Sequence, residues 1–226
     1  SLTLLEGETG IGKSLAYLIP LMLYMVQSGR RAVISTYTLQ LQNQLVQENG
    51  DLLLALAVTK SIAGRCPSYG VRKGMRNFVS VERVETVVKS MQKGASAGKQ
   101  QELSAFKEWS KTSISGDLQE WVEQTGGLPE GVTVEQVSLS PLERTGTSVE
   151  RYQLQVNSSR NVDLLLVTHA MLVRHARHWL KHLGNEERPV ELLVVDEADR
   201  LGQAEESLYT CAIDLNGVAD MVVEVE

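Results

Sequence analysis

The residues with the clearest chemical purpose form a glycine-rich segment near the start of the chain. The segment reads G-x-x-x-x-G-K-S, a pattern typical of phosphate-binding loops. The alternative explanation is a chance glycine turn before a helix. Glycines let backbone N–H groups close around phosphate oxygens, because no Cβ stands in the way. The lysine of such a loop binds the outer phosphates of ATP, and its serine hydroxyl binds Mg²⁺. The predicted ATP-binding residues are Gly7, Glu8, Thr9, Gly10, Ile11, Gly12, Lys13 and Ser14.

A second candidate site follows an apolar run at residues 192–195, where the chain continues Asp196-Glu197-Ala198-Asp199. A carboxylate at the end of a buried strand can hold Mg²⁺, usually through water, and Asp196 fits this role beside Ser14. Glu197 is then placed to orient and deprotonate an attacking water. Acidic residues often follow strands, so this motif alone is weak evidence for a site. Its combination with the glycine-rich loop at 7–14 makes a nucleotide site the favoured interpretation. Asp196, Glu197 and Lys13 are the predicted catalytic residues.

The segments that position these residues alternate between short apolar runs, typical of buried strands, and stretches with the apolar spacing of helices. Strands are expected at residues 2–5, 32–35, 162–168 and 192–195, helices at 13–27, 39–48 and 170–183, and the run 52–58 is compatible with another strand. This rhythm is typical of an α/β fold with a parallel sheet.

Residues 60–160 interrupt that rhythm and are expected to form a mostly helical insertion. A loop is predicted at 60–76, and helices at 79–92 and around Phe106 and Trp121. Residues 132–134 and 152–156 alternate apolar and polar types, as the strands of a small hairpin do. Residues 1–59 and 161–201 then form one lobe.

Composition restricts the class of protein. The chain has 226 residues with 42% hydrophobic content, enough for a buried core. It has neither an apolar run of membrane-spanning length nor the pattern of a secretion signal, so no membrane partner is expected. Its two cysteines, Cys66 and Cys211, do not suggest a disulfide scaffold, which favours a reducing cytoplasm.

Charge is distributed unevenly along the chain. The net charge is −6, yet residues 60–111 hold 11 Lys/Arg against four Asp/Glu. Such a basic block is a candidate surface for a polyanion. Solvated helix faces are the alternative explanation.

Residues 35–45, Ser-Thr-Tyr-Thr-Leu-Gln-Leu-Gln-Asn-Gln-Leu, resemble the DNA-contacting motif of the DinG and XPD family of helicases. Glu6 and the segments 16–18, 116–120 and 167–172 resemble further elements of that family. The resemblance implies the first RecA-like P-loop NTPase lobe of an ATP-dependent DNA helicase that moves 5′ to 3′ on single-stranded DNA. It also implies that 60–160 occupies the place of the family's iron–sulfur domain, and that 202–226 begins a second, arch-like insertion. A chain ending there is expected to be a fragment with weak ATP turnover by itself.

The chain departs from the family pattern at two places. The family usually has His where Asp199 stands; RNA helicases of the DEAD-box type have Asp there, but this chain lacks their Pro-Thr-Arg-Glu-Leu segment. The first cluster-binding cysteine is expected near Gly70 or Val71, and no cysteine follows Cys66 until Cys211. No iron–sulfur cluster is therefore expected. The chain is similar to the cluster-free DinG-like helicases of type IV CRISPR systems, which implies a CRISPR ribonucleoprotein partner.

DNA contacts are predicted on polar side chains that follow the second strand and in the basic loop. Hydroxyls and amides at a strand end can bind phosphates without reading sequence, although the same groups can simply cap the next helix. The basic loop can guide a single strand by charge and stacking, or be merely solvated. The predicted DNA-binding residues are Thr36, Thr38, Gln40, Arg65, Arg72, Lys73 and His169.

Three alternatives remain open from the sequence. His178 and His182 lie one helical turn apart and permit a metal site, but no acid or cysteine completes a ligand set, which favours a basic helix. The protein as a whole can also be an ATP-gated module that binds DNA or a ribonucleoprotein without unwinding it. The third alternative is an RNA-directed helicase.

Overall fold

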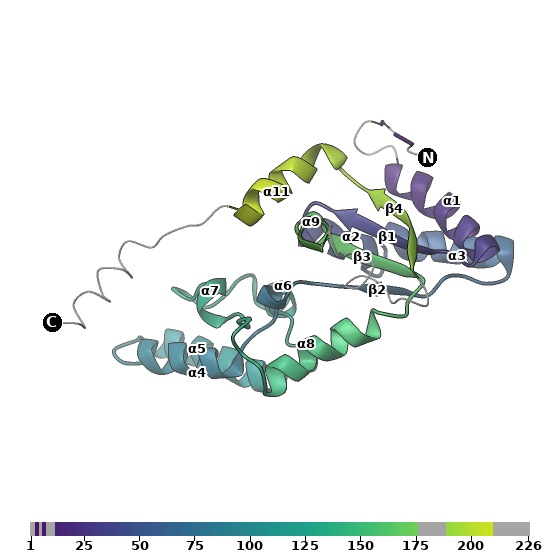
Figure 1. Cartoon of the computed structure of the whole chain (residues 1–226). Helices are drawn as coiled ribbons and strands as arrows, with labels where there is room; N and C mark the ends of the chain where they lie inside the picture. Colours follow the sequence, from purple (N-terminus) through teal and green to yellow (C-terminus); the bar gives the residue numbers. More distant parts are fainter. Residues whose placement is uncertain (1–2, 5, 8–11, 176–188, 210–226) are drawn as a thin grey trace.

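The computed structural model describes residues 3–4, 6–7, 12–175 and 189–209. Its centre is a parallel sheet with the strand order β2-β3-β1-β4 (Figure 1). The strands are β1 (Arg31–Thr36), β2 (Tyr69–Val71), β3 (Leu164–Thr168) and β4 (Val190–Val195). Parallel neighbours need crossover connections, and helices supply them here. The predicted α/β class is confirmed.

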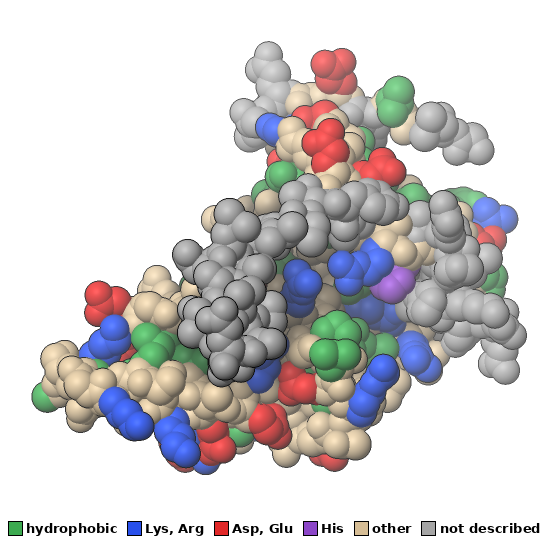
Figure 2. Space-filling model, turned by 60° about the vertical axis from the view of Figure 1, so that its left-hand side comes forward, with side chains coloured by type: hydrophobic (Ala, Val, Ile, Leu, Met, Phe, Trp, Pro, Cys, Tyr) green, Lys and Arg blue, Asp and Glu red, His purple; other side chains and the backbone are tan. Residues whose placement is uncertain are grey.

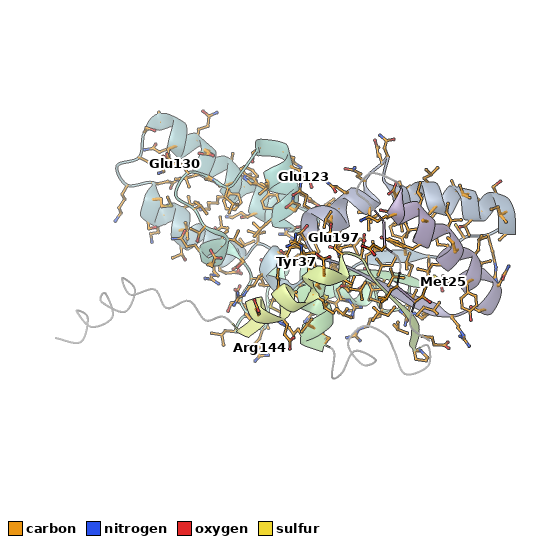
Figure 3. The ribbon with its side chains drawn as sticks, turned by 90° about the horizontal axis from the view of Figure 1, so that it is seen from above. Met25, Tyr37, Glu123, Glu130, Arg144 and Glu197 are labelled. Carbon is orange, nitrogen blue, oxygen red and sulfur yellow. The ribbon has the colours of Figure 1, made fainter. Side chains whose placement is uncertain are left out.

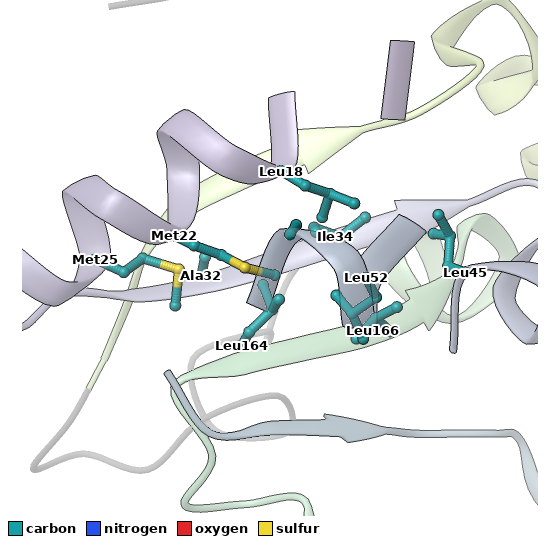
Figure 4. Packing of buried hydrophobic residues seen from close by; sticks show 10 residues of the cluster. Leu18, Met22, Met25, Ala32, Ile34, Leu45, Leu52, Leu164 and Leu166 are labelled. Carbon is teal, nitrogen blue, oxygen red and sulfur yellow. The ribbon is translucent and has the colours of Figure 1, made fainter. Parts of the chain in front are cut away.

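Helices cover both faces of the sheet. On one face lie α1 (Lys13–Ser28), α2 (Leu39–Val46) and α3 (Asp51–Ala63), whose buried side chains pack on Ile34 and Leu166 (Figure 4). On the other face, Met171 of α9 (His169–His175) packs on Val33 and Val167, and Leu201 of α11 (Leu201–Tyr209) packs against the same cluster. Alternate residues of β1 and β3 thus serve two different cores, as expected for strands buried on both faces.

The strand suggested for residues 52–58 is wrong, because these residues belong to α3. Gly50, in an extended conformation, precedes the helix, Asp51 stands in its first turn, and Gly64 ends it with a φ of 74°. An acid near the first amides and a left-handed glycine after the last turn are helix-terminal signals. The alanines and leucines between them favour a helix on propensity as well.

Between β2 and β3, all the regular elements of the insertion are helices. Its elements are η1 (Met75–Asn77), α4 (Val81–Met91), α5 (Ala97–Thr112), α6 (Leu118–Thr125), α7 (Val134–Val137) and α8 (Thr147–Ser158). They lie to one side of the sheet (Figure 1), around an apolar core in which Phe106 makes edge contact with Trp121 at 5.0 Å between ring centroids. The hairpin predicted at 132–134 and 152–156 is wrong. Val134 begins α7, whose capping box joins Thr133 and Gln136, and residues 152–156 lie within α8.

The chain enters and leaves the insertion through neighbouring strands, β2 and β3. Ser68, just before β2, donates from its backbone N–H and its hydroxyl to Asp163 Oδ2 at 2.8 and 2.7 Å. Arg72, just after β2, donates through Nε to Ser159 Oγ, just after α8, at 2.9 Å. Two side-chain clamps therefore hold the base of the insertion against the sheet.

Two edges of the described structure bear on the predictions. Thr3 and Leu4 are not in a strand and Leu4 is 83% exposed, while the rest of the strand predicted at residues 2–5 lies outside the described residues. Among the described residues β4 pairs only with β1, and its Leu193 is 46% exposed.

None of the helices in the described ranges has the length and the apolar composition that a membrane span requires.

Candidate nucleotide-binding and hydrolysis site

Three predicted segments meet at one edge of the sheet because parallel strands end there together. β1 runs into Thr36, β3 into His169 and β4 into Asp196, and β1 lies between the other two strands. The carboxyl edge of such a sheet is where α/β proteins bind their ligands. The strand order therefore brings the acid motif, the 35–45 segment and the segment containing His169 to one place.

The amino-terminal end of α1 is suited to bind a phosphate. Gly12 precedes the helix with a φ of 81°, and no side chain caps the amides of the first turn. Lys13 is the first helical residue and is exposed, and Ser14 is half-buried. Open N–H groups and the helix dipole both favour an anion at this position. The predicted ligands Glu8, Thr9, Gly10 and Ile11 lie outside the described residues, while Gly7 is described and half-buried.

Tyr17 connects α1 to the acid motif. Its hydroxyl donates to Asp196 Oδ2 at 3.0 Å, and Ser14 stands one helical turn before it on α1. Burial, followed by the charge of Asp196 and the hydrogen bond to it, raises the pKa of Tyr17 well above its usual range, while the nearby Ser14 side chain acts in the opposite direction. The side chains predicted to hold Mg²⁺, Ser14 and Asp196, thus converge on one hydroxyl. Hydroxyl and carboxylate oxygens are ligands that Mg²⁺ prefers, so the residues fit the ion.

Glu197 occupies a special turn beside Asp196. It is the one non-glycine residue with a positive φ in the described part of the chain, at φ 53° and ψ 50°. Its N–H donates to Asp196 Oδ1 at 3.1 Å, and its side chain is exposed. The left-handed turn directs the two neighbouring carboxylates differently: Asp196 is tied to α1, whereas Glu197 is free to take a proton from water.

Removing the Tyr17 hydroxyl is expected to lower stability. The bond to an ionised carboxylate contributes about 1–2 kcal/mol in a partly buried setting, so Tyr17→Phe should lower the free energy of unfolding by that amount in urea titrations. Tyr24→Phe is the matched control, because Tyr24 lies on the same helix and its exposed hydroxyl only accepts from Arg30. Equal stability of the two variants would contradict the link.

Among the predicted DNA-binding residues, those after β1 take different positions. Thr38 accepts a hydrogen bond from the Leu41 N–H at 3.2 Å and caps α2, so its capping role is present in the structure. Thr36 is buried and donates to the Thr38 carbonyl, and Gln40 is exposed. Arg65 is exposed and donates to the Val26 carbonyl at the end of α1. DNA contact by these residues stays a prediction.

Arg72 and Lys73 do not present the free cations expected of a DNA-guiding loop. They are 4% and 7% exposed. Lys73 Nζ binds Asp117 Oδ2 at 2.5 Å, and Arg72 donates to Ser159 and to the Val156 carbonyl of α8. Burial, together with the nearby charge of Arg160, lowers the pKa of Arg72 to about 10. The insertion uses both cations internally, so their placement does not support the predicted DNA contact.

His169 is likewise turned inward and is 0% exposed. The suggested metal pair, His178 and His182, lies outside the described residues. In the ranges that are described, no group of three or more His, Cys, Asp or Glu side chains is arranged to hold a metal. On the face shown in Figure 2, several Lys and Arg side chains gather near the middle, and acidic side chains are interspersed toward the rim.

The sequence placed Tyr17 and Ser35 in segments that resemble the family, but it gave neither residue an individual role. Tyr17 follows Ser14 by three residues on α1, which puts both on one face of the helix. That spacing was a usable signal for a link to the metal site. Ser35 lies on β1, and only the strand order shows which residues flank it.

No protein-family profile matches the chain. Several curated proteins are similar to it at low identity. The ATP-dependent DNA helicase YoaA of Haemophilus influenzae is 27% identical over 204 residues, which cover 87% of this chain and 29% of that protein. The ATP-dependent helicase DinG of Mycobacterium tuberculosis is 26% identical over 214 residues, covering 87% of this chain and 31% of that protein. A protein of Staphylococcus epidermidis named 3′-5′ exonuclease DinG is 26% identical over 205 residues, covering 88% and 20%.

The chain spans less than a third of the length of these relatives. The similar region includes most of the described sheet and the insertion, since it extends over nearly nine-tenths of the chain. Over most of its length, this chain is therefore similar to a part of proteins named as DinG and YoaA helicases.

Proposed function

We propose that this chain is the first RecA-like motor lobe of an ATP-dependent DNA helicase of the DinG type. The observation that carries the proposal is the convergence of Ser14, Tyr17 and Asp196 where the start of α1 meets the end of β4. The names of the relatives support the same activity. The substrates are ATP with Mg²⁺ and single-stranded DNA.

The chain's own residues divide the work of hydrolysis. Lys13 and the open amides at the start of α1 bind phosphate oxygens and offset the charge that develops there. Ser14 and Asp196 hold Mg²⁺, and Tyr17 keeps the Asp196 carboxylate on the α1 side of the site. Glu197 accepts the proton of the attacking water. Bound Mg-ATP supplies the phosphoanhydride bond that is broken.

Finer features of the proposal rest on the sequence resemblance. They are 5′-to-3′ movement, an insertion at 60–160 without an iron–sulfur cluster, a second insertion from 202 onward and service to a type IV CRISPR ribonucleoprotein. Cys66 is exposed, and the described part of the chain places no further cysteine beside it. A loop, 65–68, in which Arg65, Cys66 and Ser68 are exposed, leads into β2, where the sequence resemblance places the family's first cluster ligand.

Strand displacement by the full-length protein that contains this chain tests the proposal. A 5′-tailed DNA duplex should be unwound with ATP, whereas a 3′-tailed duplex, an RNA duplex and the Lys13→Ala variant should give none. Unwinding from the 3′ tail would overturn the direction, and RNA-only unwinding would favour the RNA-directed alternative. ATP-dependent DNA binding without displacement of any duplex would favour a binding module.

A further inference from the structure

His169 lies between the acid motif and the strand that leads into the 35–45 segment. Its Nδ1 is 2.6 Å from Ser35 Oγ, and its Nε2 is 3.4 Å from the backbone carbonyl oxygen of Glu197. The residue is fully buried at the end of β3. A buried imidazole with a partner on each nitrogen is a bridge between two elements.

The bridge has a defined hydrogen-bond direction. A carbonyl oxygen only accepts, so the Nε2 nitrogen carries the hydrogen and donates to Glu197. In a neutral imidazole Nδ1 then accepts from the Ser35 hydroxyl. The order of donation therefore runs from Ser35 through His169 to Glu197.

Two further contacts tie the same elements together. The Asp196 N–H donates to the Ser35 carbonyl at 2.9 Å, so β1 also touches the acid motif through its backbone. The Tyr37 ring lies 6.1 Å from the His169 ring, tilted by 49°. Tyr37 and Glu197, which are both labelled in Figure 3, are thus both neighbours of the buried imidazole.

We propose that His169 is a positioning residue that couples nucleic-acid occupancy of the 36–40 segment to the setting of Glu197. This inference rests on the proposed function. Glu197 holds a left-handed conformation that is unfavourable for a non-glycine residue, and the carbonyl contact helps to retain it. Ser35 immediately precedes Thr36 and is hydrogen-bonded to His169. A nucleic-acid strand that binds at 36–40 and shifts the end of β1 therefore also shifts the imidazole. The rigid ring passes that displacement to the Glu197 backbone.

Two substitutions of His169 each remove one of its two hydrogen bonds and keep the other. In His169→Gln the terminal amide nitrogen occupies the place of Nε2 and keeps the contact with Glu197 while losing Ser35. In His169→Asn the side-chain amide occupies the place of Nδ1 and keeps Ser35 while losing Glu197. Thr59→Val is the matched control: it removes a buried hydroxyl of α3 that has no hydrogen-bond partner among the described residues.

The experiment measures single-stranded DNA affinity of the full-length protein by fluorescence anisotropy, with and without a non-hydrolysable ATP analogue and Mg²⁺. Coupling between two sites is typically about 5- to 150-fold in affinity. Wild type and Thr59→Val should show coupling in that range, and both His169 variants should fall to about two-fold or less. DNA-stimulated ATP turnover, divided by turnover without DNA, should fall in parallel.

Each outcome has a separate meaning. Variants that keep wild-type coupling would overturn the role of His169 and leave the proposed function intact. A variant that lowers basal and stimulated turnover by the same factor, with coupling kept, would show a structural role only and would also overturn it. Wild type without any coupling or stimulation would defeat the proposed function, and the inference with it.

Discussion

Replacing Glu197 with glutamine is expected to lower ATP turnover by about 10²- to 10⁴-fold, the range that a general base contributes. The amide has the same shape but cannot take a proton from the attacking water. The backbone turn at φ 53° and the contact of the Glu197 N–H with Asp196 do not involve the replaced group. Mg-ATP binding should therefore stay within about three-fold of wild type, since only a transition-state interaction is lost.

Single-turnover hydrolysis and equilibrium nucleotide binding, both with the full-length protein, separate these two effects. Asp199→Asn is the matched control, because Asp199 is an exposed carboxylate two residues further along whose described ion pair is with its neighbour Arg200. It should retain turnover within about three-fold. Loss of nucleotide binding in Glu197→Gln, or an equal loss of turnover in Asp199→Asn, would contradict the assignment of the base.

Lys73→Met is expected to lower the free energy of unfolding by about 3 kcal/mol, as removal of one partner from a buried ion pair does. Lys73 Nζ and Asp117 Oδ2 are 2.5 Å apart, and both side chains are nearly buried. Asp117 also accepts from the Gln119 N–H at 3.0 Å and caps α6. The substitution leaves that carboxylate buried without its cation, while methionine retains most of the side-chain volume.

Urea unfolding and single-stranded DNA binding distinguish this structural role from the DNA contact predicted by sequence. Arg76→Met is the control, since Arg76 belongs to the same basic stretch and is exposed. It should change stability by less than about 0.5 kcal/mol. Unchanged stability in Lys73→Met, together with weaker DNA binding and a shallower salt dependence, would return Lys73 to the DNA-binding surface.

The sequence was informative where local pattern and tertiary context agree. β1, β3 and β4 were found as short runs rich in Val, Ile and Leu, and β1 and β3 are buried on both faces. It failed at α3, whose continuous apolar run reads equally as strand or helix, and the terminal residues Asp51 and Gly64 decided the outcome. It also failed at α8, where alternating Tyr152, Leu154 and Val156 imitate a strand.

For the site, the sequence predicted candidate reacting groups but not the side chains that contact them. Lys13, Ser14, Asp196 and Glu197 belong to spacings with a known chemical purpose. Tyr17 shares a helix face with Ser14, but its contact with Asp196 and the position of His169 depend on the strand order, which places β4 and β3 on either side of β1. Burial of Lys73 was equally invisible, because a cation in a basic stretch looks exposed until its partner, 44 residues away in sequence, is known.

The clamps at the base of the insertion also have a mechanical meaning. β2 and β3 lie parallel, and the insertion leaves from the carboxyl end of β2 and returns to the amino end of β3. A force that pulls the carboxyl end of β2 and the amino end of β3 away from the sheet therefore acts on the two strands in opposite directions along their length. We expect the Ser68–Asp163 and Arg72–Ser159 contacts to bear that load in shear, together with the hydrogen bonds between β2 and β3. In shear, all these bonds carry the load at the same time, and they do not break one after another. The insertion would then act as a lever anchored in the sheet.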